Sequence, residues 1–236
     1  MVDFHAHILP EMDDGADSVE TSLAMLRESF RQGVDLICAT PHFYADEEDP
    51  ETFLRRRSEA YSRLREAMGD GEGFPRILLG AEILFFPGIS VSEEIRALCL
   101  EGTPILLVEP PMVPWTETML DEIESCVTSL FCVPVIAHLD RYMRLLNDPS
   151  LLDRVSGRKM LIQVNAGFFL HRQSRSIALD CLKSGSIHFI GTDCHDLDNR
   201  PPNLEDALEV IRDAGAEKQF ELFNARIVQA LKKAVG

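Results

Sequence analysis

The sequence has no apolar run that approaches the roughly 20 residues needed to span a membrane, so we expect no membrane insertion. It opens directly on a predicted strand, without the basic and apolar regions of a secretion signal. Its six cysteines form no CxxC pair and no regular framework, which argues against a disulfide scaffold. We therefore expect a cytoplasmic protein whose cysteines are reduced thiols, most of them in the core.

Positive charge is also scarce, because 23 lysines and arginines stand against 39 aspartates and glutamates and leave a net charge of −16. Such a negative field repels the phosphate backbone, so we expect no nucleic-acid partner. Most of the acidity is typical of a solvated surface that keeps a protein in solution. Part of it is expected at metal sites, where bound cations offset it.

Nothing in the sequence marks a domain boundary. It has no linker rich in proline, glycine and serine, no internal repeat and no low-complexity tract. Its 236 residues, with 45% hydrophobic content, are enough for one sizeable core. We expect residues 1–236 to form a single domain.

Short apolar runs alternate regularly with longer helical patterns. The predicted strands are Val2–His7, Leu36–Thr40, Ile77–Glu82, Ile105–Glu109, Val133–His138, Leu161–Asn165 and Ile187–Asp193. The predicted helices are Val19–Gln32, Pro50–Met68, Val91–Cys99, Glu117–Leu130, Leu151–Val155, Ser174–Ser184, Leu204–Ala214 and Glu217–Ala234. The first helix has Asp17 as its predicted N-cap and Gly33 just past its end. The alternation predicts parallel strands joined by crossover helices, and seven such units favour an α/β protein built as a distorted (β/α)7 TIM-like barrel.

Each predicted strand ends in, or is closely followed by, a residue that can hold a metal ion or a phosphate group. These residues are His7, His42, Glu82, Glu109, His138, Asn165 and Asp193. In a barrel the carboxyl ends of the strands meet on one face, where active sites are built. In an open sheet the same residues would be spread along an edge, so their pattern also favours the barrel.

The opening Asp3-Phe4-His5-Ala6-His7 is the clearest of these groups. Alternate residues of a strand point the same way, so His5 and His7 face one side, which favours metal ligands over ordinary core histidines. Asp3 points to the same side and is expected to orient one of the imidazoles. Asp14 follows in a loop that by itself would be an ordinary turn, and beside two histidines it is expected to be an oxygen ligand.

The later strand ends supply the remaining candidates. Glu82 and Glu109 are included because a glutamate is rarely buried unless it is paired or bound to a cation. The set of nine candidate ligands is completed by His42, His138, Asp193 and His195. Mixed imidazole and carboxylate ligands suit Mn, Fe or Zn, and a set of this size is enough for two or three ions. Cys194 lies on the opposite face of its strand, so we expect it to pack in the core.

Two arginines follow candidate ligands at the same predicted face. Arg141 and Arg200 each present a planar fork of donors that matches phosphate oxygens, although their positions fit ordinary surface charge equally well. The arginines of the second predicted helix differ, because that helix also holds glutamates. A solvated face is therefore expected for Arg55, Arg56, Arg57, Arg63 and Arg65. No role is assigned to His171 and His188.

With these residues in place, the chain resembles the PHP (polymerase and histidinol phosphatase) superfamily of metallophosphoesterases. Within it, the chain is similar to the bacterial tyrosine-protein phosphatases of the CpsB/YwqE type, which act in capsule and exopolysaccharide regulation. The segments that carry the resemblance span nearly the whole chain. They are DFHAHILPEMDDGADSVETSLAML, ATPHFY, GAEI, LLVEPP, PVIAHLDRY, LIQVNAG and HFIGTDCHDLDNRPP.

The resemblance implies a PHP fold with a cluster of three divalent ions, usually manganese, with Fe, Zn or Mg as alternatives. One ion would be held by His5, His7, Glu82 and Asp193. A second would be held by Glu82, Glu109 and His138. A third would be held by Asp14, His42 and His195. The phosphate would be bound by Arg141 and Arg200.

The implied reaction is metal-dependent hydrolysis of a phosphate monoester, with phosphotyrosine on a protein as the substrate and a bacterial tyrosine kinase as the expected partner. The ions would lower the pKa of the attacking water, and Arg141 and Arg200 would stabilise the charge on the transferring group. His42, His195 or an aquated ion would protonate the leaving oxygen. Cys194 and Arg200 do have the Cys-x5-Arg spacing, but Cys194 is expected to pack in the core, which argues against a cysteinyl-phosphate route.

Three alternatives stay open. A small-molecule phosphatase such as histidinol phosphatase would use the same site. A nuclease fits less well, because the sequence shows no basic track for a nucleic-acid strand. A non-catalytic metal-binding module that partners a kinase is disfavoured, because such a module has no physical need for arginines that face a phosphate.

Overall fold

The computed structural model describes residues 1–148 and 150–235. Its strands are β1 (Val2–Ala6), β2 (Leu36–Ala39), β3 (His42–Phe43), β4 (Arg76–Leu79), β5 (Glu82–Leu84), β6 (Ile105–Glu109), β7 (Val133–Ile136), β8 (Leu161–Asn165) and β9 (Phe189–Gly191). Its α-helices are α1 (Val19–Arg31), α2 (Pro50–Met68), α3 (Glu117–Ser129), α4 (Leu139–Leu145), α5 (Leu151–Ser156), α6 (Gly167–Leu170), α7 (Arg175–Ser184), α8 (Leu204–Asp213) and α9 (Glu217–Val235). Two 3-10 helices, η1 (Ile89–Val91) and η2 (Glu93–Leu98), lie between β5 and β6.

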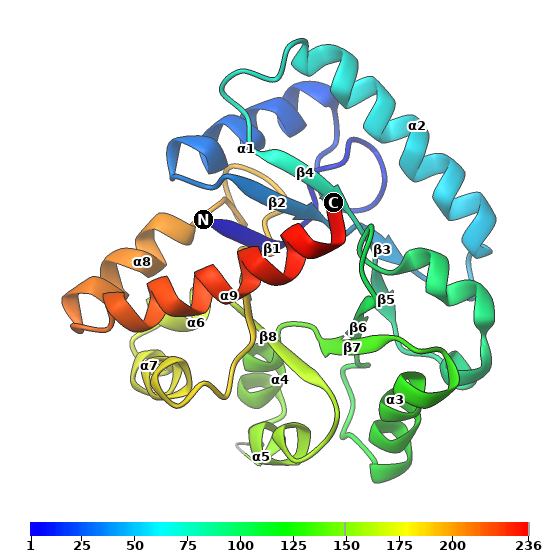
Figure 1. Cartoon of the computed structure of the whole chain (residues 1–236), viewed down its shortest axis with the longest axis vertical. Helices are drawn as coiled ribbons and strands as arrows, with labels where there is room; N and C mark the ends of the chain where they lie inside the picture. The colour runs from blue at the N-terminus through cyan, green and yellow to red at the C-terminus, as the bar shows by residue number, and fades with distance from the viewer. Residues whose placement is uncertain (149, 236) are drawn as a thin grey trace.

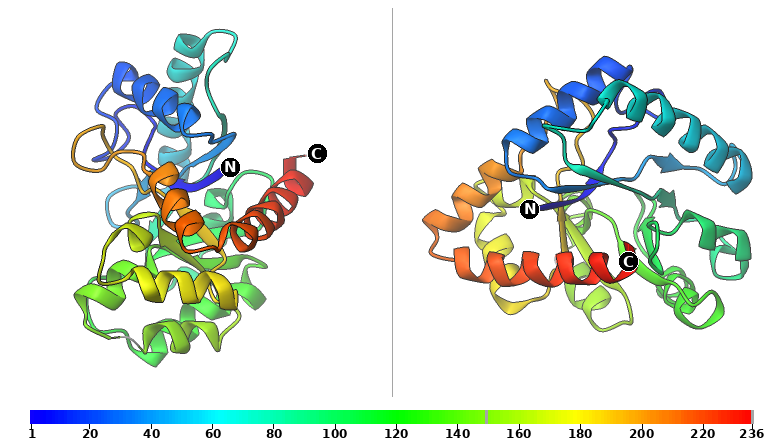
Figure 2. Two further views of the ribbon diagram at one scale, coloured as in Figure 1. Left: turned by 90° about the vertical axis from the view of Figure 1, so that its left-hand side faces the viewer. Right: turned by 45° about the horizontal axis from the view of Figure 1, so that its top comes forward.

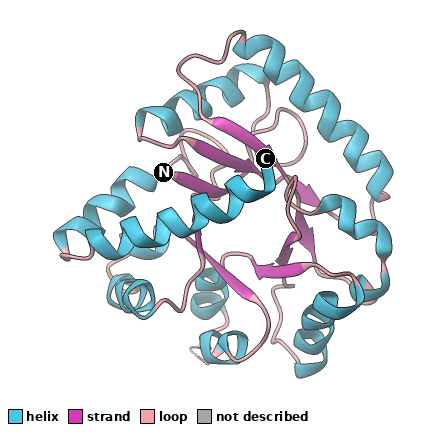
Figure 3. Cartoon of the chain, in the orientation of Figure 1, coloured by secondary structure: helices cyan, strands magenta, loops and turns pink. Residues whose placement is uncertain are grey.

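The strands pair in parallel in two runs, β1-β2-β4 and β3-β5-β6-β7-β8-β9. β1 also lies beside the end of β9, where the His7 N–H donates to the Cys194 carbonyl at 2.9 Å and the Asp193 N–H donates to the His5 carbonyl at 2.8 Å. Figure 1 shows a curled sheet whose strands surround a common centre, with the helices outside. The same arrangement is coloured by element type in Figure 3. The predicted α/β class with parallel strands is confirmed.

Two of the predicted strands are each broken into two pieces. The second is divided into β2 and β3 at Thr40-Pro41, and the third into β4 and β5 at Gly80-Ala81. Proline has no N–H to donate to a neighbouring strand. At Gly80 a Cβ would lie only 3.1 Å from Leu100 Cδ1, so the chain is tightly packed at this point. β2 and β4 pair on the β1 side, whereas β3 and β5 pair toward β6. The strands therefore change partners directly before His42 and Glu82.

α1 begins at Val19, as predicted, but its N-cap differs from the prediction. Its N-cap is Ser18, whose Oγ accepts from the Thr21 N–H at 3.1 Å. Asp17 accepts from the Thr21 hydroxyl at 2.6 Å instead. The prediction of Asp17 as the N-cap is therefore wrong, because aspartate and serine cap equally well and local geometry decides between neighbours. Gly33 follows the helix with a φ of 82°, as predicted for a glycine past a helix end.

The helices between the strands are otherwise close to their predicted bounds, with two exceptions. The predicted helix over Val91–Cys99 is replaced by η1 and η2, because the backbone at Ser92 (φ −86°, ψ 89°) interrupts it. α4 and α6 were not predicted, because each is too short to show a helical apolar period. Both follow a strand at its carboxyl end.

α9 closes the amino-terminal end of the sheet. Its Phe223 and Ile227 belong to one apolar cluster with Val2, Phe4 and Phe189 from the first and last strands. Figure 1 shows α9 crossing in front of β1. The left view of Figure 2 shows α9 on one side of the molecule and the loops after β1 and β9 on the other. The carboxyl ends of the strands are thus the end that is free to form a site.

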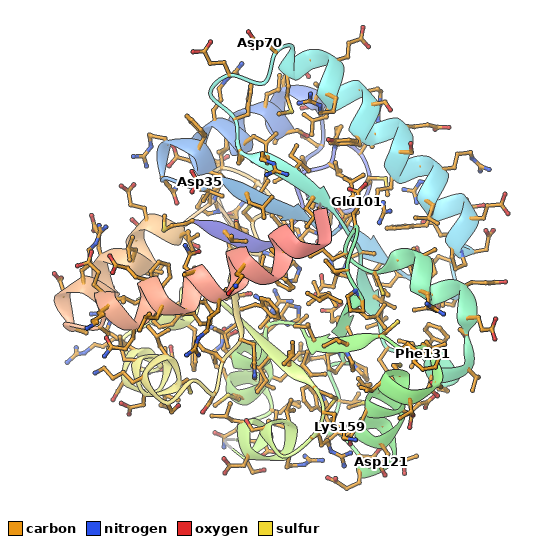
Figure 4. All side chains as sticks on the ribbon, viewed as in Figure 1. Asp35, Asp70, Glu101, Asp121, Phe131 and Lys159 are labelled. Carbon is orange, nitrogen blue, oxygen red and sulfur yellow. The ribbon has the colours of Figure 1, made fainter. Side chains whose placement is uncertain are left out.

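The outside of the molecule is acidic and its cysteines are inside. Asp35, Asp70 and Asp121 lie at the periphery in Figure 4, and the side chains of Asp35 and Asp121 are 84% and 66% exposed. No helix in the described ranges is long and apolar enough to cross a membrane. All six cysteines are free and buried, as predicted.

Candidate metal centre

All nine predicted ligands converge at the carboxyl end of the strands. Three groups bring their potential ligand atoms within 4.8 Å of one another: His7, Asp14, His42 and His195; His5, His7 and Asp193; and His42, Glu82 and Glu109. His138 joins them, since its Nε2 lies 2.8 Å from Glu82 Oε1 and 3.3 Å from Glu109 Oε1. Residues that are far apart in the sequence thus form one cluster of imidazoles and carboxylates.

Glu82 lies in the middle of this cluster and is completely buried. Its Oε2 lies 3.1 Å from His5 Nε2 and 3.3 Å from His7 Nε2. The same oxygen lies 3.2 Å from His42 Nδ1, while Oε1 contacts His138. Burial disfavours a charged carboxylate, but His5 and His138 outweigh it and hold the pKa of Glu82 well below its ordinary value. A charged carboxylate with both oxygens among imidazoles is suited to bridge two cations.

Asp13 orients His7, a role that the sequence did not indicate. Its Oδ2 lies 2.7 Å from His7 Nδ1 and accepts from the His42 N–H at 2.8 Å, while Oδ1 accepts from the Gly15 N–H at 3.0 Å. Burial alone would lower the pKa of His7, but the Asp13 carboxylate outweighs it and raises that pKa to about 10. The Nε2 atom of His7 is thereby turned toward the cluster. The turn Asp13-Asp14-Gly15 was the signal in the sequence that could have indicated this role. Its first aspartate accepts hydrogen bonds from backbone N–H groups, whereas its second, Asp14, is exposed.

Asp3 does not orient an imidazole, contrary to the prediction. Its two oxygens accept from the N–H and the hydroxyl of Thr192, at 2.8 and 2.6 Å, and more weakly from the His5 N–H at 3.3 Å. Burial outweighs these bonds and raises the pKa of Asp3 to about 6. Asp3 instead ties β1 to the end of β9 below the cluster.

β1 and β9 approach each other very closely where Gly191 lies against His5. A Cβ at Gly191 would lie 2.6 Å from the Cβ and 2.7 Å from the N of His5, so only glycine fits there. A Cβ at Gly15 would similarly lie 2.3 Å from the His7 carbonyl oxygen. Two glycines therefore allow the backbone to pass directly against the first two candidate ligands.

Arg141 reaches the cluster from α4 and Arg200 reaches it from the loop after β9. Arg141 donates to Asp193 Oδ2, and its Nη1 lies 3.7 Å from Glu109 Oε1. Arg200 Nη2 lies 2.7 Å from Asp193 Oδ1. Both side chains remain partly open to solvent. The two guanidinium groups are therefore at the mouth of the cluster, where a phosphate group would enter, and not on an unrelated part of the surface.

The solvent side of the cluster is formed by His42, His195 and Asp14. Asp14 is 67% exposed, and its Oδ1 lies 3.3 Å from His195 Nε2 and 3.5 Å from His42 Nε2. Burial, together with the positive charges of His7 and Arg200, lowers the pKa of His195 to about 4. Burial also lowers the pKa of His42. Both rings are therefore neutral at physiological pH, which is the form a metal ligand needs.

The cluster fits divalent cations. Within the described residues, four of its buried side-chain atoms have no hydrogen-bond partner: Glu82 Oε2, His42 Nδ1, His138 Nδ1 and His195 Nε2. A buried polar atom without a partner costs free energy, and such atoms are rare in folded proteins. Three of these atoms, Glu82 Oε2, His42 Nδ1 and His195 Nε2, face other candidate ligand atoms, and cations among the imidazoles and carboxylates would give them partners. The absence of thiolate and the mixture of nitrogen and oxygen suit Mn, Fe or Zn.

A family model described as capsular polysaccharide synthesis, CpsB/CapC, matches residues 1–230. The chain belongs to the CpsB/CapC family. Its curated relatives include the tyrosine-protein phosphatase CpsB of Streptococcus pneumoniae, 30% identical over 237 residues that cover 94% of this chain and 95% of the relative. The tyrosine-protein phosphatase YwqE of Bacillus subtilis is 29% identical over 94% of this chain and 88% of its own length. The resemblance drawn from the sequence is confirmed.

A solved structure of this family matches the fold as a whole. It comes from the pair YwqE of Bacillus subtilis and CpsB of Streptococcus pneumoniae, described as unique metal-dependent tyrosine phosphatases. It aligns with a TM-score of 0.82 at 26% identity over 95% of this chain and 92% of that one. A D-hydantoinase from a Bacillus species aligns with a TM-score of 0.52 at 12% identity, which shows likeness of fold alone.

In this CpsB/CapC-family chain, the arginines of α2 are not all on a solvated face. Arg57 is 9% exposed and donates to the Gly80 carbonyl at 2.6 Å. Arg56 donates to the Met12 carbonyl at 2.8 Å. Arg63 pairs with Glu11 at 2.5 Å. The prediction is wrong for the buried Arg57, which lies over the break between β4 and β5, and it holds for the exposed Arg55, Arg63 and Arg65.

The remaining candidates lie outside the cluster. Cys194 is completely buried, and burial raises the pKa of its thiol, so the prediction of a packing role is confirmed. His171 is exposed. His188 lies between β8 and β9, where its Nδ1 accepts from the Ile162 N–H at 3.1 Å.

Proposed function

We propose that this member of the CpsB/CapC family is a metal-dependent phosphatase that hydrolyses phosphate monoesters, with phosphotyrosine on a protein as its substrate. The observation that carries the proposal is the position of Arg141 and Arg200 against Asp193, at the open side of a buried cluster of imidazoles and carboxylates. Donors that match phosphate oxygens thus stand beside ligands that match divalent cations. The curated relatives named tyrosine-protein phosphatases support the choice of substrate.

The site would hold two or three divalent ions, with Mn first and Fe, Zn or Mg as alternatives. The first ion would be held by His5, His7, Glu82 and Asp193, the second by Glu82, Glu109 and His138, and the third by Asp14, His42 and His195. When bound, the ions supply Lewis-acid activation of the phosphoryl group and lower the pKa of the attacking water.

The residues of the chain itself have separable tasks in this reaction. Arg141 and Arg200 bind the phosphoryl oxygens and stabilise the charge that develops on them, with the N–H groups that Asp193 does not occupy. Four carboxylates, Asp14, Glu82, Glu109 and Asp193, offset the charge of the ions. His42 and His195 are neutral and are proposed ligands, so the proton of the leaving oxygen would come from an aquated ion at the solvent side of the cluster.

The setting of this site is also proposed. Residues 1–236 would form one domain, with β2 and β3 counted as one strand and β4 and β5 as another, so that the strands make a distorted (β/α)7 barrel. The protein would act in the cytoplasm on a bacterial tyrosine kinase, in capsule or exopolysaccharide regulation. The six free, buried thiols support a reducing compartment.

The experiment compares phosphate release from a phosphotyrosine peptide and from histidinol phosphate, with matched variants on α4. Arg141→Met is expected to lower turnover of the peptide by 10²-fold or more, on the order seen when one charge-stabilising donor is removed. Arg144→Met, one turn later and exposed, is the control and should retain full turnover. Faster phosphate release from histidinol phosphate than from the peptide would indicate a small-molecule phosphatase. Phosphate release from neither substrate would favour the remaining alternative, a non-catalytic metal-binding module.

A further inference from the structure

Two neutral amides on β8 contact three of the predicted metal ligands. Gln163 is completely buried. Its Oε1 lies 2.5 Å from the backbone N of His138 and 3.2 Å from His5 Nδ1. Its Nε2 lies 3.0 Å from Asn165 Oδ1, and Asn165 Nδ2 lies 2.9 Å from Asp193 Oδ2. A continuous chain of hydrogen bonds therefore runs beneath the cluster from His5 to Asp193.

One backbone N–H fixes the direction of every bond in this chain. The N–H of His138 can only donate, so the atom of Gln163 that faces it has to be the oxygen. The same oxygen faces His5 Nδ1, which must therefore carry a hydrogen and donate it. The amide nitrogen of Gln163 then donates to the oxygen of Asn165. This leaves the nitrogen of Asn165 to donate to Asp193.

The bond to Gln163 sets which nitrogen of His5 can bind a metal. A neutral imidazole with its hydrogen on Nδ1 has its lone pair on Nε2. His5 Nε2 lies 3.1 Å from His7 Nε2 and 3.1 Å from Glu82 Oε2, at the buried centre of the cluster. Were the hydrogen on Nε2 instead, the ring would turn a donor toward the site and could not bind the ion.

The same two amides hold two residues in an unfavourable backbone conformation. His138 has a φ of 30° and Asp193 a φ of 55°, a region that residues other than glycine rarely adopt. Positions of this kind persist only where the surroundings over-determine them. Gln163 holds the N–H of His138, and Asn165 holds the carboxylate of Asp193. Both strained residues are predicted ligands. The hydrogen bonds of Gln163 and Asn165 therefore hold two ligands at positions where the backbone conformation is unfavourable.

We propose that Gln163 and Asn165 are positioning residues of the metal centre, which set the tautomer of His5 and hold His138 and Asp193 in place for the ions. The proposal rests on the proposed function, which requires those ions. Position 163 needs an amide because it accepts two hydrogen bonds and donates one. A glutamate there would accept but not donate, and a methionine of similar size would do neither.

The test uses the whole protein after removal of metal, and it has two readouts. The first is the affinity for Mn²⁺, from the free Mn²⁺ signal in electron paramagnetic resonance. The second is the long-range ¹H–¹⁵N spectrum of the histidine rings in the metal-free protein. Gln163→Met is expected to weaken the tightest Mn²⁺ site by about 10–100-fold, the usual effect of losing a group that orients a ligand. It is also expected to abolish the spectral signature of the Nδ1-protonated tautomer at His5.

Two further variants separate positioning from a loss of stability. Gln163→Glu keeps the oxygen and is expected to restore the His5 signature that Gln163→Met loses. Val164→Ala removes buried methyl groups from the same strand on its opposite face, so it should destabilise the fold and leave the Mn²⁺ affinity unchanged.

The outcomes distinguish this proposal from the proposed function. Unchanged affinity and an unchanged His5 signature in Gln163→Met would overturn the positioning role, and so would an equal loss of affinity in Val164→Ala. A wild-type protein that binds none of Mn²⁺, Fe²⁺, Zn²⁺ and Mg²⁺ would overturn both proposals. A wild-type protein that binds Mn²⁺ and responds to Gln163→Met, but releases no phosphate from any substrate, would overturn the proposed function alone.

Discussion

The Nε2 atoms of His5 and His7 lie 3.1 Å apart at the completely buried centre of the cluster. The other nitrogen of each ring is held by an acceptor, Gln163 for His5 and Asp13 for His7. Both rings therefore direct Nε2 at the same point. Two lone pairs at this distance repel each other unless a positive charge lies between them. In the metal-free protein a proton on His7 supplies that charge, and in the proposed enzyme a divalent ion takes its place.

This convergence predicts that metal stabilises the fold. With free Mn²⁺ at 100 times its dissociation constant, one site adds about 2.7 kcal/mol to the free energy of unfolding, and further sites add to it. We expect the midpoint of thermal unfolding to rise when Mn²⁺ replaces a chelator in the buffer. Calorimetry measures both midpoints. An equal midpoint with Mn²⁺ and with chelator would mean that the cluster binds no Mn²⁺ in the folded state.

Asp13 predicts an effect of charge on metal binding without loss of a ligand. Asp13→Asn keeps one acceptor oxygen, enough for the N–H of either His42 or Gly15, and removes the charge that holds His7 Nδ1. We expect the affinity for Mn²⁺ to fall by about 10–100-fold. The affinity is measured by competition with a coloured chelator. Asp17→Asn, at an exposed position four residues later, is the control and should bind as the wild type does.

The arginines of α2 predict different costs at neighbouring positions. Arg57→Met leaves the buried Gly80 carbonyl without its donor, so we expect a loss of about 1–3 kcal/mol in the free energy of unfolding. Arg55→Met, on the exposed face, should change it by less than about 0.5 kcal/mol. Urea unfolding of the metal-free proteins gives both values. Equal losses in the free energy of unfolding for the two variants would mean that Arg57 lies on a solvated face, as the sequence predicted.

His188 predicts a pH dependence of stability that is independent of the metal centre. Burial lowers the pKa of His188, and its neutral Nδ1 accepts from the Ile162 N–H. A group whose folded-state pKa is depressed contributes stability above its unfolded pKa of about 6.5, and this contribution is lost as the pH falls through the folded value. His188→Asn keeps an acceptor but cannot be protonated. Between pH 7 and pH 5, the metal-free variant should therefore lose less stability in urea than the wild type does, whereas parallel curves for the two would contradict this.

Much of the site was predictable because each candidate ligand stands at a recurring place in the chain. His5 and His7 alternate on a strand, and Glu82, Glu109 and His138 each close an apolar run. The parallel alternation of strands and helices then predicts that these ends meet. Nothing beyond local sequence and the geometry of parallel strands is needed for that inference.

The partners of buried polar groups were not predictable in the same way. Asp3 bonds Thr192, 189 residues away, and Gln163 bonds the backbone of His138. Whether Asp3 faces an imidazole or the neighbouring strand depends on how closely β1 and β9 approach each other. That distance is set by Gly191, because a Cβ at this position would collide with His5. Arg57 shows the same limit, because its partner is a carbonyl that the break between β4 and β5 exposes.

The central claim, that this cluster is a metal-dependent phosphatase centre, is tested most directly by one measurement. Protein purified without chelator is analysed for bound metal and assayed for phosphate release from a phosphotyrosine peptide, with added Mn²⁺ and with a chelator. We predict two or three bound ions per chain and phosphate release that requires them. Bound ions with no phosphate release, or release that continues unchanged in the chelator, would contradict the claim.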